Sequence, residues 1–467
     1  MEWPRQTKII ATLGPATATP EAISSLIEAG ANIFRLNMSH ARHDWAATVV
    51  GHIRQSAAGR PIAILADLQG PAIRTGTVET PFQLEAGQPF IFYTDQRPPG
   101  PQSVSVNYPG LANDLNPGDS ILIDNGLIRM KVLAETDGTI ECEVLVGGEM
   151  GSRRHINLPG VKVNLPALTE KDRADIECVL ALEVDFIALS FVREAKDIAE
   201  LRAAVADAPR PPRLVAKIED QHAVKHLDPI LEATDAIMIA RGDLGVECPY
   251  EELPIIQRRI SKLCQQRGCP VIVATHMLES MIENPHPTRA EVTDVANAVF
   301  EQADAIMLSG ETSVGKFPQT CVEVADRIAR RIERSGGANY HKTAQLDDPR
   351  EKLAHSAVRM ANDLDAAALV VFTRVGGMVP EAARMRPRHA PILALCLNDQ
   401  IARALALHRA VRPIVLPWDQ GDPDETTERA LKELANRRIL NKGDTTVVIS
   451  SELAVESIAD SIQMKVV

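Results

Sequence analysis

Short apolar runs recur along the chain, and each one breaks into a polar cluster at its carboxyl end. Eight such runs precede residue 320, at residues 7–15, 33–40, 62–71, 186–193, 213–220, 236–245, 270–277 and 305–313. Most are separated by stretches with helical spacing, including residues 20–29, 197–205, 255–267 and 289–301. Strands that alternate with helices in this number predict a (β/α)8 TIM barrel. The carboxyl ends of the strands carry the chemistry of such barrels, and this sequence concentrates its charge there.

Two further segments depart from this pattern. Residues 72–165 are rich in turn signals, and their alternating stretches predict hairpin strands. Beyond residue 346, strand-like and helix-like stretches alternate again. We therefore expect three domains: a catalytic barrel at residues 1–71 and 166–345, an inserted small β-barrel domain at residues 72–165, and a C-terminal doubly wound α/β domain of regulatory type at residues 346–467. The insertion projects from a barrel loop at the catalytic end. We therefore expect it to act as a lid that excludes water rather than as a passive insertion.

The composition restricts the classes of partner. A chain of 467 residues is long enough for about three domains, and a hydrophobic content of 45% with only 3% aromatics predicts aliphatic cores. The net charge of −12 and the pI near 5.6 argue against nucleic acid or an anionic membrane as a partner. A polar start and the lack of a membrane-length apolar run favour a cytoplasmic protein. The seven cysteines form no CxxC pair and are interpreted as reduced packing residues.

Two strand ends carry the strongest chemical signal. Period-2 alternation places Lys217 and Glu219 on one face of the same strand. The following run ends in Gly242 and Asp243, where the glycine allows a ligand to approach the backbone closely. Two carboxylates from neighbouring strands, completed by water and substrate oxygens, suit Mg²⁺, so Glu219 and Asp243 are a candidate metal site. Two structural salt bridges are the alternative, and the repetition of polar strand ends favours the metal site.

Other strand ends add cations and hydroxyls. Alternation sends Arg35, Asn37 and Ser39 to one face of the second strand, where buried polar side chains are costly unless a ligand satisfies them. The remaining strand ends contribute Asp67, Arg74, Thr275 and Ser309. This inventory fits phosphoryl transfer, in which catalysis consists of positioning and charge neutralisation.

An ordered series of motifs resembles the pyruvate kinase family. The series spans nearly the whole chain and consists of residues 7–15, 35–40, 70–76, 158–160, 217–219, 240–245, 274–281, 287–291 and 308–312. Each motif is weak alone, whereas the ordered series is highly specific. The resemblance implies that phosphoenolpyruvate and ADP react to give pyruvate and ATP in glycolysis. It also implies Mg²⁺ (or Mn²⁺) and often K⁺ as cofactors, and a homotetramer as the assembly.

The resemblance assigns catalytic roles to residues of this chain. Glu219 and Asp243 would hold the Mg²⁺, and Lys217 would neutralise charge on the transferring phosphoryl group and on the enolate. The backbone at Gly242 and Asp243 would hold the substrate carboxylate together with Thr275. Thr275 would also take part in proton transfer to the enolate, with Ser309 as a weaker candidate.

Further residues would bind phosphates and K⁺. Arg35 would bind phosphate oxygens of the substrate. The nucleotide phosphates would meet Asn37, Ser39, His40, Arg74 and Arg154. Arg154 stands where the family usually has lysine, which keeps the charge and changes its geometry. The K⁺ would lie among Asn37, Ser39, Asp67 and the backbone oxygen of Leu68.

The sequence departs from the family at two places. Ala72 replaces the glutamate of K⁺-dependent members and the lysine of K⁺-independent ones, and without an internal ammonium we expect K⁺ binding to be retained. Residues 372–378 keep only Thr373 and a glycine of the loop that holds an effector phosphate, and residues 451–457 introduce two acids nearby. Acids repel phosphate, so we expect altered or absent activation by sugar bisphosphates.

Two other functions remain as alternatives. A Mg²⁺-dependent barrel lyase acting on pyruvate or phosphoenolpyruvate would share the acid pair, but it would not need Lys217, Arg74 or the inserted lid. A catalytically silent metabolite sensor would not be expected to retain Lys217, Glu219, Asp243 and Thr275.

Overall fold

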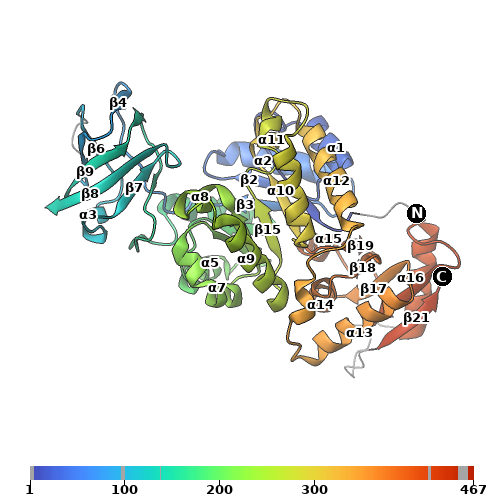
Figure 1. Ribbon diagram of the computed structural model, residues 1–467. Coiled ribbons are helices and arrows are strands. Elements are labelled where there is room, and N and C mark those ends of the chain that lie inside the picture. The colour runs from blue at the N-terminus through green and yellow to red at the C-terminus, as the bar shows by residue number, and fades with distance from the viewer. Residues whose placement is uncertain (1–4, 96–99, 137, 419–421, 451–460) are drawn as a thin grey trace.

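The computed structural model describes residues 5–95, 100–136, 138–418, 422–450 and 461–467. A closed barrel occupies the middle of the molecule, as Figure 1 shows. A β-sheet domain projects from one side of the barrel, and an α/β domain packs at the other. The barrel therefore lies between the two other parts of the molecule.

Eight parallel strands close the barrel in the order β1-β16-β15-β14-β13-β12-β3-β2. They are β1 (Lys8–Thr12), β2 (Ile33–Asn37), β3 (Ala63–Asp67), β12 (Phe186–Leu189), β13 (Arg213–Ile218), β14 (Ala236–Ala240), β15 (Val271–Ala274) and β16 (Ala305–Leu308). Each strand lies within one of the predicted apolar runs, which confirms the predicted (β/α)8 barrel. The surrounding helices are α1 (Pro20–Ala29), α2 (His43–Ala57), α4 (Glu170–Ala181), α5 (Ala195–Val205), α6 (Gln221–Lys225), α7 (Leu227–Ala233), α8 (Arg241–Glu247), α9 (Leu253–Arg267), α10 (Arg289–Phe300), α11 (Gly310–Ser313) and α12 (Pro318–Glu333).

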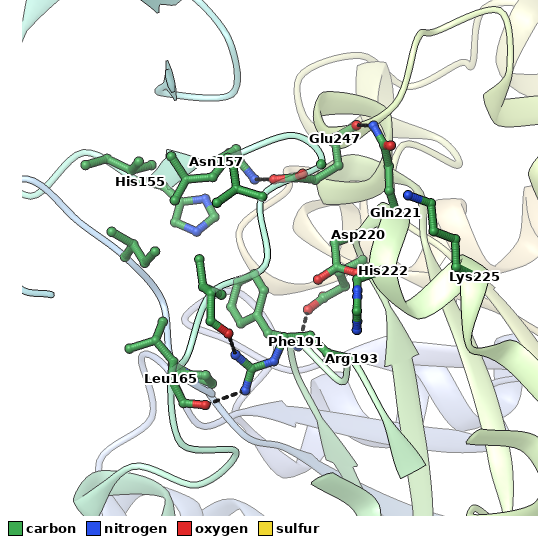
Figure 2. Close-up of a pocket in the computed structure, with 18 residues that line it drawn as sticks. His155, Asn157, Leu165, Phe191, Arg193, Asp220, Gln221, His222, Lys225 and Glu247 are labelled. Atoms are coloured by element: carbon green, nitrogen blue, oxygen red, sulfur yellow. Dashed lines mark hydrogen bonds between the residues drawn. The ribbon is translucent and has the colours of Figure 1, made fainter. Parts of the chain in front are cut away.

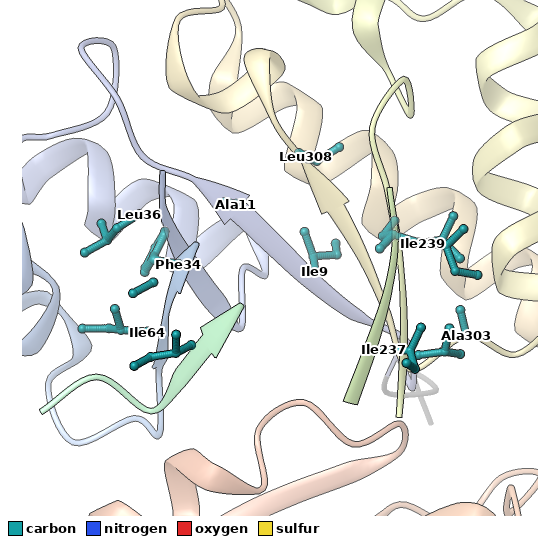
Figure 3. Packing of buried hydrophobic residues seen from close by; sticks show 14 of the residues in the cluster. Ile9, Ala11, Phe34, Leu36, Ile64, Ile237, Ile239, Ala303 and Leu308 are labelled. Atoms are coloured by element: carbon teal, nitrogen blue, oxygen red, sulfur yellow. The ribbon is translucent and has the colours of Figure 1, made fainter. Parts of the chain in front are cut away.

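Alternation along each strand divides the barrel into two aliphatic cores. Ile9 and Ala11 face outward and pack in the layer between strands and helices, which Figure 3 shows from close by. Ile10 belongs instead to the cluster that fills the interior of the barrel. Ala406 and Leu407 of the C-terminal domain join this interior cluster. Because the interior is packed and its base is covered, ligands have access only at the carboxyl ends of the strands.

Most strand pairs of the inserted domain are antiparallel, as the turn signals predict, and one pair is parallel. Its six-stranded sheet has the order β11-β7-β8-β9-β5-β6, and β10 pairs with β4 in a separate sheet. The elements are β4 (Phe82–Leu84), β5 (Pro89–Tyr93), β6 (Ser103–Ser105), α3 (Leu111–Asp114), β7 (Ser120–Ile123), β8 (Ile128–Thr136), β9 (Thr139–Val146), β10 (Gly148–Met150) and β11 (Ile156–Asn157).

The C-terminal domain has a five-stranded sheet in the order β19-β18-β17-β20-β21. Its elements are α13 (Pro349–Asp363), β17 (Ala368–Thr373), α14 (Met378–Arg384), β18 (Ile392–Cys396), α15 (Asp399–Ala404), β19 (Val411–Val415), α16 (Pro423–Asn436), β20 (Thr445–Ile449) and β21 (Ile462–Val466). The sequence did not predict β21, which runs antiparallel to β20 at the edge of the sheet.

All eight barrel strands end before their predicted runs do, and at two of them this changes the setting of site residues. β2 ends at Asn37, and residues 38–40 form a turn, so strand alternation does not extend to Ser39. β14 ends at Ala240, and Arg241 begins the short helix α8 with Asp243 in its first turn. Within the described ranges, no helix is long and apolar enough to cross a membrane.

Candidate active site

A cluster of buried charges lies at the carboxyl ends of β2, β3 and β13. The guanidinium Nη2 of Arg35 lies 2.7 Å from Oδ2 of Asp67, and Nη1 donates to Oγ1 of Thr12 at 3.2 Å. The Lys217 ammonium lies 2.9 Å from Oε1 of Glu219 and 3.3 Å from Oδ1 of Asp67. The expected placement of Lys217 and Glu219 on one face is therefore correct, and Asp67 connects them to Arg35.

Two residues that directly follow β12 form hydrogen bonds with this cluster. Lys217 Nζ donates to Ser190 Oγ at 2.7 Å, and Ser190 Oγ donates to the Leu68 carbonyl at 2.7 Å. The Phe191 N–H donates to Oε2 of Glu219 at 2.7 Å. Sequence reasoning did not single out Ser190 or Phe191, although both belong to the polar end of a predicted strand.

The cluster shifts the pKa of its members in opposite directions. Burial, strengthened by the charge of Asp243 and opposed by Lys217, raises the pKa of Glu219 to about 7. Burial disfavours the Lys217 ammonium, but Asp67 and Glu219 outweigh it and raise the pKa of Lys217. Burial also disfavours the Asp67 carboxylate, yet Lys217 and Arg35 keep its pKa below the usual value. Lys217 therefore stays protonated at neutral pH. A further positive charge near Glu219 would stabilise the charged form of its carboxyl group.

Glu219 and Asp243 fit a hard divalent cation. The Asp243 charge contributes to the raised pKa of Glu219, so the two carboxylates interact. Carboxylate oxygens are the ligand type that Mg²⁺ prefers, and Mg²⁺ usually retains several waters. No cluster of three or more His, Cys, Asp and Glu side chains suited to a metal occurs in the part of the chain that the structure describes. A cation bound by these two acids would thus need oxygens from water and substrate, as the sequence predicts.

Gly242 and Thr275 meet where β14 and β15 end. The Gly242 N–H donates to Thr275 Oγ1 at 2.7 Å, and this hydroxyl donates to the Ala274 carbonyl at 2.6 Å. Thr275 and His276 have φ values of 66° and 52°, in the left-handed region that β-branched residues rarely adopt. Strained backbone of this kind concentrates at ligand-binding loops, which is consistent with the predicted carboxylate-binding role.

A cavity lies between the barrel and the inserted domain (Figure 2). The barrel side of its wall includes Glu219, Asp220 and Arg193, and α8 adds Glu247. Asn157 of β11 closes the wall from the inserted domain. Glu219 thus faces a space that the inserted domain covers.

Arg35 lines a second cavity, together with residues that follow β1 and β16. Asn37 and His40 also line it. Ser309 also lines it, and its Oγ is buried without a hydrogen-bond partner among the described residues. Trp45 of α2 completes the wall, and sequence reasoning missed it because it lies on a helix rather than at a strand end.

The residues expected to hold K⁺ lie near one another, but the oxygens of Asn37, Asp67 and Leu68 have partners in this arrangement. Asn37 Oδ1 accepts from the Ser39 N–H at 3.2 Å, and the Leu68 carbonyl accepts from Ser190. Asp67 is paired with cations on both oxygens. Gly70 follows in this loop with a φ of 67°, and a Cβ there would lie 2.8 Å from the Ser190 carbonyl.

Arg74 and Arg154 lie at the base of the inserted domain and line neither cavity. Arg154 Nη1 pairs with Oδ2 of Asp124 at 2.9 Å. Arg74 Nη1 donates to the Arg153 carbonyl at 3.1 Å. The inserted domain would have to move for these two arginines to join the barrel cluster.

The effector-type loop of the C-terminal domain is held by its own backbone. Thr373 Oγ1 accepts from the Gly376 N–H at 2.6 Å. Residues 451–457, where the sequence places two acids, lie outside the described residues. The expectation of altered effector control therefore stays a prediction.

Known proteins of one family match this chain over most of its length. Residues 4–322 match the family model of the pyruvate kinase barrel domain, and residues 351–462 match that of the pyruvate kinase alpha/beta domain. The chain is 41% identical over 457 residues to the pyruvate kinase of Methylorubrum extorquens, covering 96% of this chain and 95% of that one. It is 41% identical over 459 residues to the pyruvate kinase of Geobacillus stearothermophilus, covering 95% of this chain and 77% of the relative.

A solved structure matches the fold equally well. The crystal structure of a pyruvate kinase from Cryptosporidium parvum aligns with a TM-score of 0.93 at 34% identity, covering 99% of this chain and 96% of that chain.

Proposed function

The chain belongs to the pyruvate kinase family, and we infer that its phosphoryl transfer takes place at the cluster of Arg35, Asp67, Lys217 and Glu219. Its function is to transfer the phosphoryl group of phosphoenolpyruvate to ADP, which gives pyruvate and ATP in glycolysis. The observation that supports this location is the buried Lys217 ammonium, held between two carboxylates within 3.3 Å. Such a fixed positive charge is what a moving phosphoryl group requires.

In the proposed mechanism, the bond between phosphorus and the enol oxygen breaks as a bond to the β-phosphate oxygen of ADP forms. Lys217 and Arg35 stabilise the negative charge on the transferring group and on the enolate that remains. The Gly242 and Asp243 backbone and Thr275 hold the substrate carboxylate. The enolate then takes a proton at its methylene carbon, and we propose the Thr275 hydroxyl as part of that relay.

Glu219 and Asp243 would hold a Mg²⁺ or Mn²⁺ ion. When bound, the ion supplies Lewis-acid polarisation and orients the phosphoryl oxygens. The raised pKa of Glu219 supports this assignment, because a nearby dication would favour the carboxylate form.

The second cavity is the proposed nucleotide site. Asn37, Ser39 and His40 lie along it or beside it, and the Trp45 ring offers a flat apolar surface for a base. Arg74 and Arg154 would reach the phosphates when the inserted domain closes as a lid. A K⁺ among Asn37, Ser39, Asp67 and the Leu68 carbonyl is proposed to assist, after exchange of the hydrogen bonds that these oxygens now accept.

We propose that the domain limits are residues 1–71 and 166–345 for the barrel, 72–165 for the lid and 346–467 for the C-terminal domain. A homotetramer in the cytoplasm is the proposed assembly and location. Exposed apolar surface supports the homotetramer. Met464 and Val466 on the edge strand β21 are 52% and 62% exposed, and Ile255 on α9 is 59% exposed. Sedimentation velocity would test the assembly, and a monomer at micromolar concentration would contradict it.

A coupled assay for pyruvate formation tests the proposed function. We expect pyruvate from phosphoenolpyruvate only when ADP and Mg²⁺ are both present, with a higher rate in K⁺ than in a bulky monovalent cation. The variant Lys217→Met should lower kcat by about 10²–10³-fold or more, while Mn²⁺ binding measured by electron paramagnetic resonance stays intact. Pyruvate without ADP would indicate a lyase, and no pyruvate from folded protein would indicate a sensor.

A further inference from the structure

A buried hydrogen bond between two side chains joins the lid (residues 72–165) to the barrel. Asn157 Nδ2 of β11 donates to Oε1 of Glu247, the last residue of α8, at 3.0 Å. Both side chains are buried, although they are separated by 90 residues in the sequence. Figure 2 shows this contact at the edge of the cavity between lid and barrel. Asn157 and Glu247 are called the lid contact below.

The barrel side of the lid contact is fixed in place. Gln221 Nε2 of α6 donates to the main-chain carbonyl of Glu247, which holds the end of α8. Burial raises the pKa of Glu247 to about 7, with Asp220 and Asp243 adding to the effect and the hydrogen bond from Asn157 opposing it. The other charged or titratable groups around the cavity are Glu219, Arg193, His222, Lys225 and His155. A carboxyl buried in this position must make its hydrogen bond well, or its burial is costly.

The lid side of the contact carries the arginines proposed to meet the nucleotide. Arg154 precedes Asn157 by three residues, and His155 forms an isolated β-bridge with Arg74. The His155 ring also lies 5.6 Å, centroid to centroid, from the ring of Phe191. The strand that ends at Asn157 therefore connects Arg74 and Arg154 to the barrel.

The barrel side leads to the opposite end of α8. The same helix begins with Arg241, Gly242 and Asp243, the proposed metal and carboxylate site. The lid contact is therefore attached to the same short helix as the proposed metal site.

We propose that Glu247 and Asn157 are positioning residues that fix the base of the lid to the barrel, so that closure of the lid about this contact brings Arg74 and Arg154 to ADP. Neither touches a reacting atom. The inference rests on the proposed function, because it assigns the nucleotide phosphates to the lid and phosphoenolpyruvate to the barrel.

Steady-state kinetics tests the proposal through its two substrates. In Glu247→Ala and in Asn157→Ala, we expect kcat/KM for ADP to fall about tenfold or more, the effect of losing a buried hydrogen bond. The Kd for phosphoenolpyruvate with Mg²⁺, measured calorimetrically, should change less than about twofold because that ligand binds the barrel. The double variant should be no worse than the poorer single variant, because both changes remove the same contact.

Two control variants separate hydrogen bonding from charge and from general damage. Glu247→Gln keeps an acceptor for Asn157, so it should stay within about threefold of the wild type. Lys225→Ala changes an exposed side chain on the same cavity and should have less than about a twofold effect. Equal thermal midpoints among the variants would exclude a folding defect as the cause.

Hydrogen–deuterium exchange gives a readout that needs no catalysis. Amides of the lid base, at residues 72–78 and 150–157, should exchange faster in Glu247→Ala than in the wild type, Glu247→Gln or Lys225→Ala. Unchanged exchange, additive losses in the double variant, or an equal loss of phosphoenolpyruvate binding would overturn the proposal. A wild-type protein without ADP-dependent activity would overturn the proposed function instead, and the exchange result would still decide whether the contact holds the lid.

Discussion

Arg241 shows how one side chain stabilises a strained active-site loop. Its Nη2 donates to the carbonyls of Thr275 and His276 at 2.7 and 3.1 Å, and Nε donates to the Thr275 carbonyl at 3.3 Å. The guanidinium is buried, and its remaining nitrogen pairs with Asp294 at 3.1 Å. These bonds stabilise the two consecutive left-handed residues, and so they keep the Thr275 hydroxyl against the Gly242 amide.

A conservative change at Arg241 should therefore impair catalysis. In Arg241→Lys the charge remains, but an ammonium cannot reproduce the planar fork that binds several carbonyls at once. We expect kcat/KM for phosphoenolpyruvate to fall by about 10²-fold, the scale of losing precise orientation, while the KM for ADP changes little. The matched control Asp294→Asn removes only the half-exposed partner and should cost less than about threefold. Similar losses for both substrates would argue against this specific role.

At the scale of elements, the start of α4 positions the loop that follows β3. The helix begins after Thr169 in a capping box with Asp172, whose Oδ2 accepts from the Thr169 N–H at 2.9 Å. The other oxygen of this fully buried carboxylate accepts from the Gly70 N–H at 3.1 Å. One helix terminus thus holds both its own first turn and the backbone beside Leu68, a proposed K⁺ ligand.

Removing this carboxylate should affect stability and K⁺ activation together. Asp172→Ala leaves the buried Gly70 N–H and the half-buried Thr169 N–H without their acceptor, so we expect a loss of about 2 kcal/mol or more in unfolding free energy. The K⁺ concentration for half-maximal activity should rise, because the loop that carries the Leu68 carbonyl is released. Urea unfolding and a K⁺ titration of activity measure the two effects. Glu170→Ala, in the same turn but exposed, is the control. Lower stability with an unchanged K⁺ titration would refute the link to the ion.

The barrel strands were predictable from the sequence because a closed parallel barrel buries each strand on both faces and leaves its polar residues at the end. Helix α8 was not, since Gly242 and Gly245 are poor helix formers and the helix depends on tertiary contacts such as those of Arg241. Ser39 was placed on a strand because alternation alone does not show where a strand stops. Trp45 and the lid contact were missed because they depend on packing between segments distant in sequence.

At the scale of the whole molecule, the C-terminal domain docks on the base of the barrel through buried charges. Arg386 binds Asp304 with two hydrogen bonds of 2.7 Å, and Arg403 Nε donates to Asp185 at 2.8 Å. Asp304 and Asp185 directly precede β16 and β12, so the domain contacts the amino ends of strands whose carboxyl ends form the site. Buried pairs of this kind are costly to break from one side, which favours a fixed orientation of the two domains.

Lys8 makes this docking surface sensitive to pH. It begins β1, it is buried, and its ammonium donates to the Val411 carbonyl of the C-terminal domain. Burial lowers the pKa of Lys8 to about 7, and the neighbouring cations Arg5 and Arg412 add to the effect. In the unfolded chain Lys8 has its ordinary pKa of about 10.4. Between these two values the unfolded state binds a proton that the folded state does not, so stability falls as the pH decreases from about 10 to about 7.

Replacing Lys8 should remove this part of the pH dependence. Relative to wild type, Lys8→Met should gain stability steadily as the pH is lowered from 9.5 to 7, and the difference should level off below about pH 7, where both states of the wild type are protonated. Urea unfolding midpoints at a series of pH values measure it. Loss of the hydrogen bond to Val411 shifts the midpoint by the same amount at every pH. The test is therefore the slope of the midpoint against pH. Lys352→Met on the exposed face of α13 provides the control. A parallel pair of curves for wild type and Lys8→Met would show that Lys8 is charged at the interface throughout this range, and that its buried ammonium is stabilised there by more than the Val411 carbonyl.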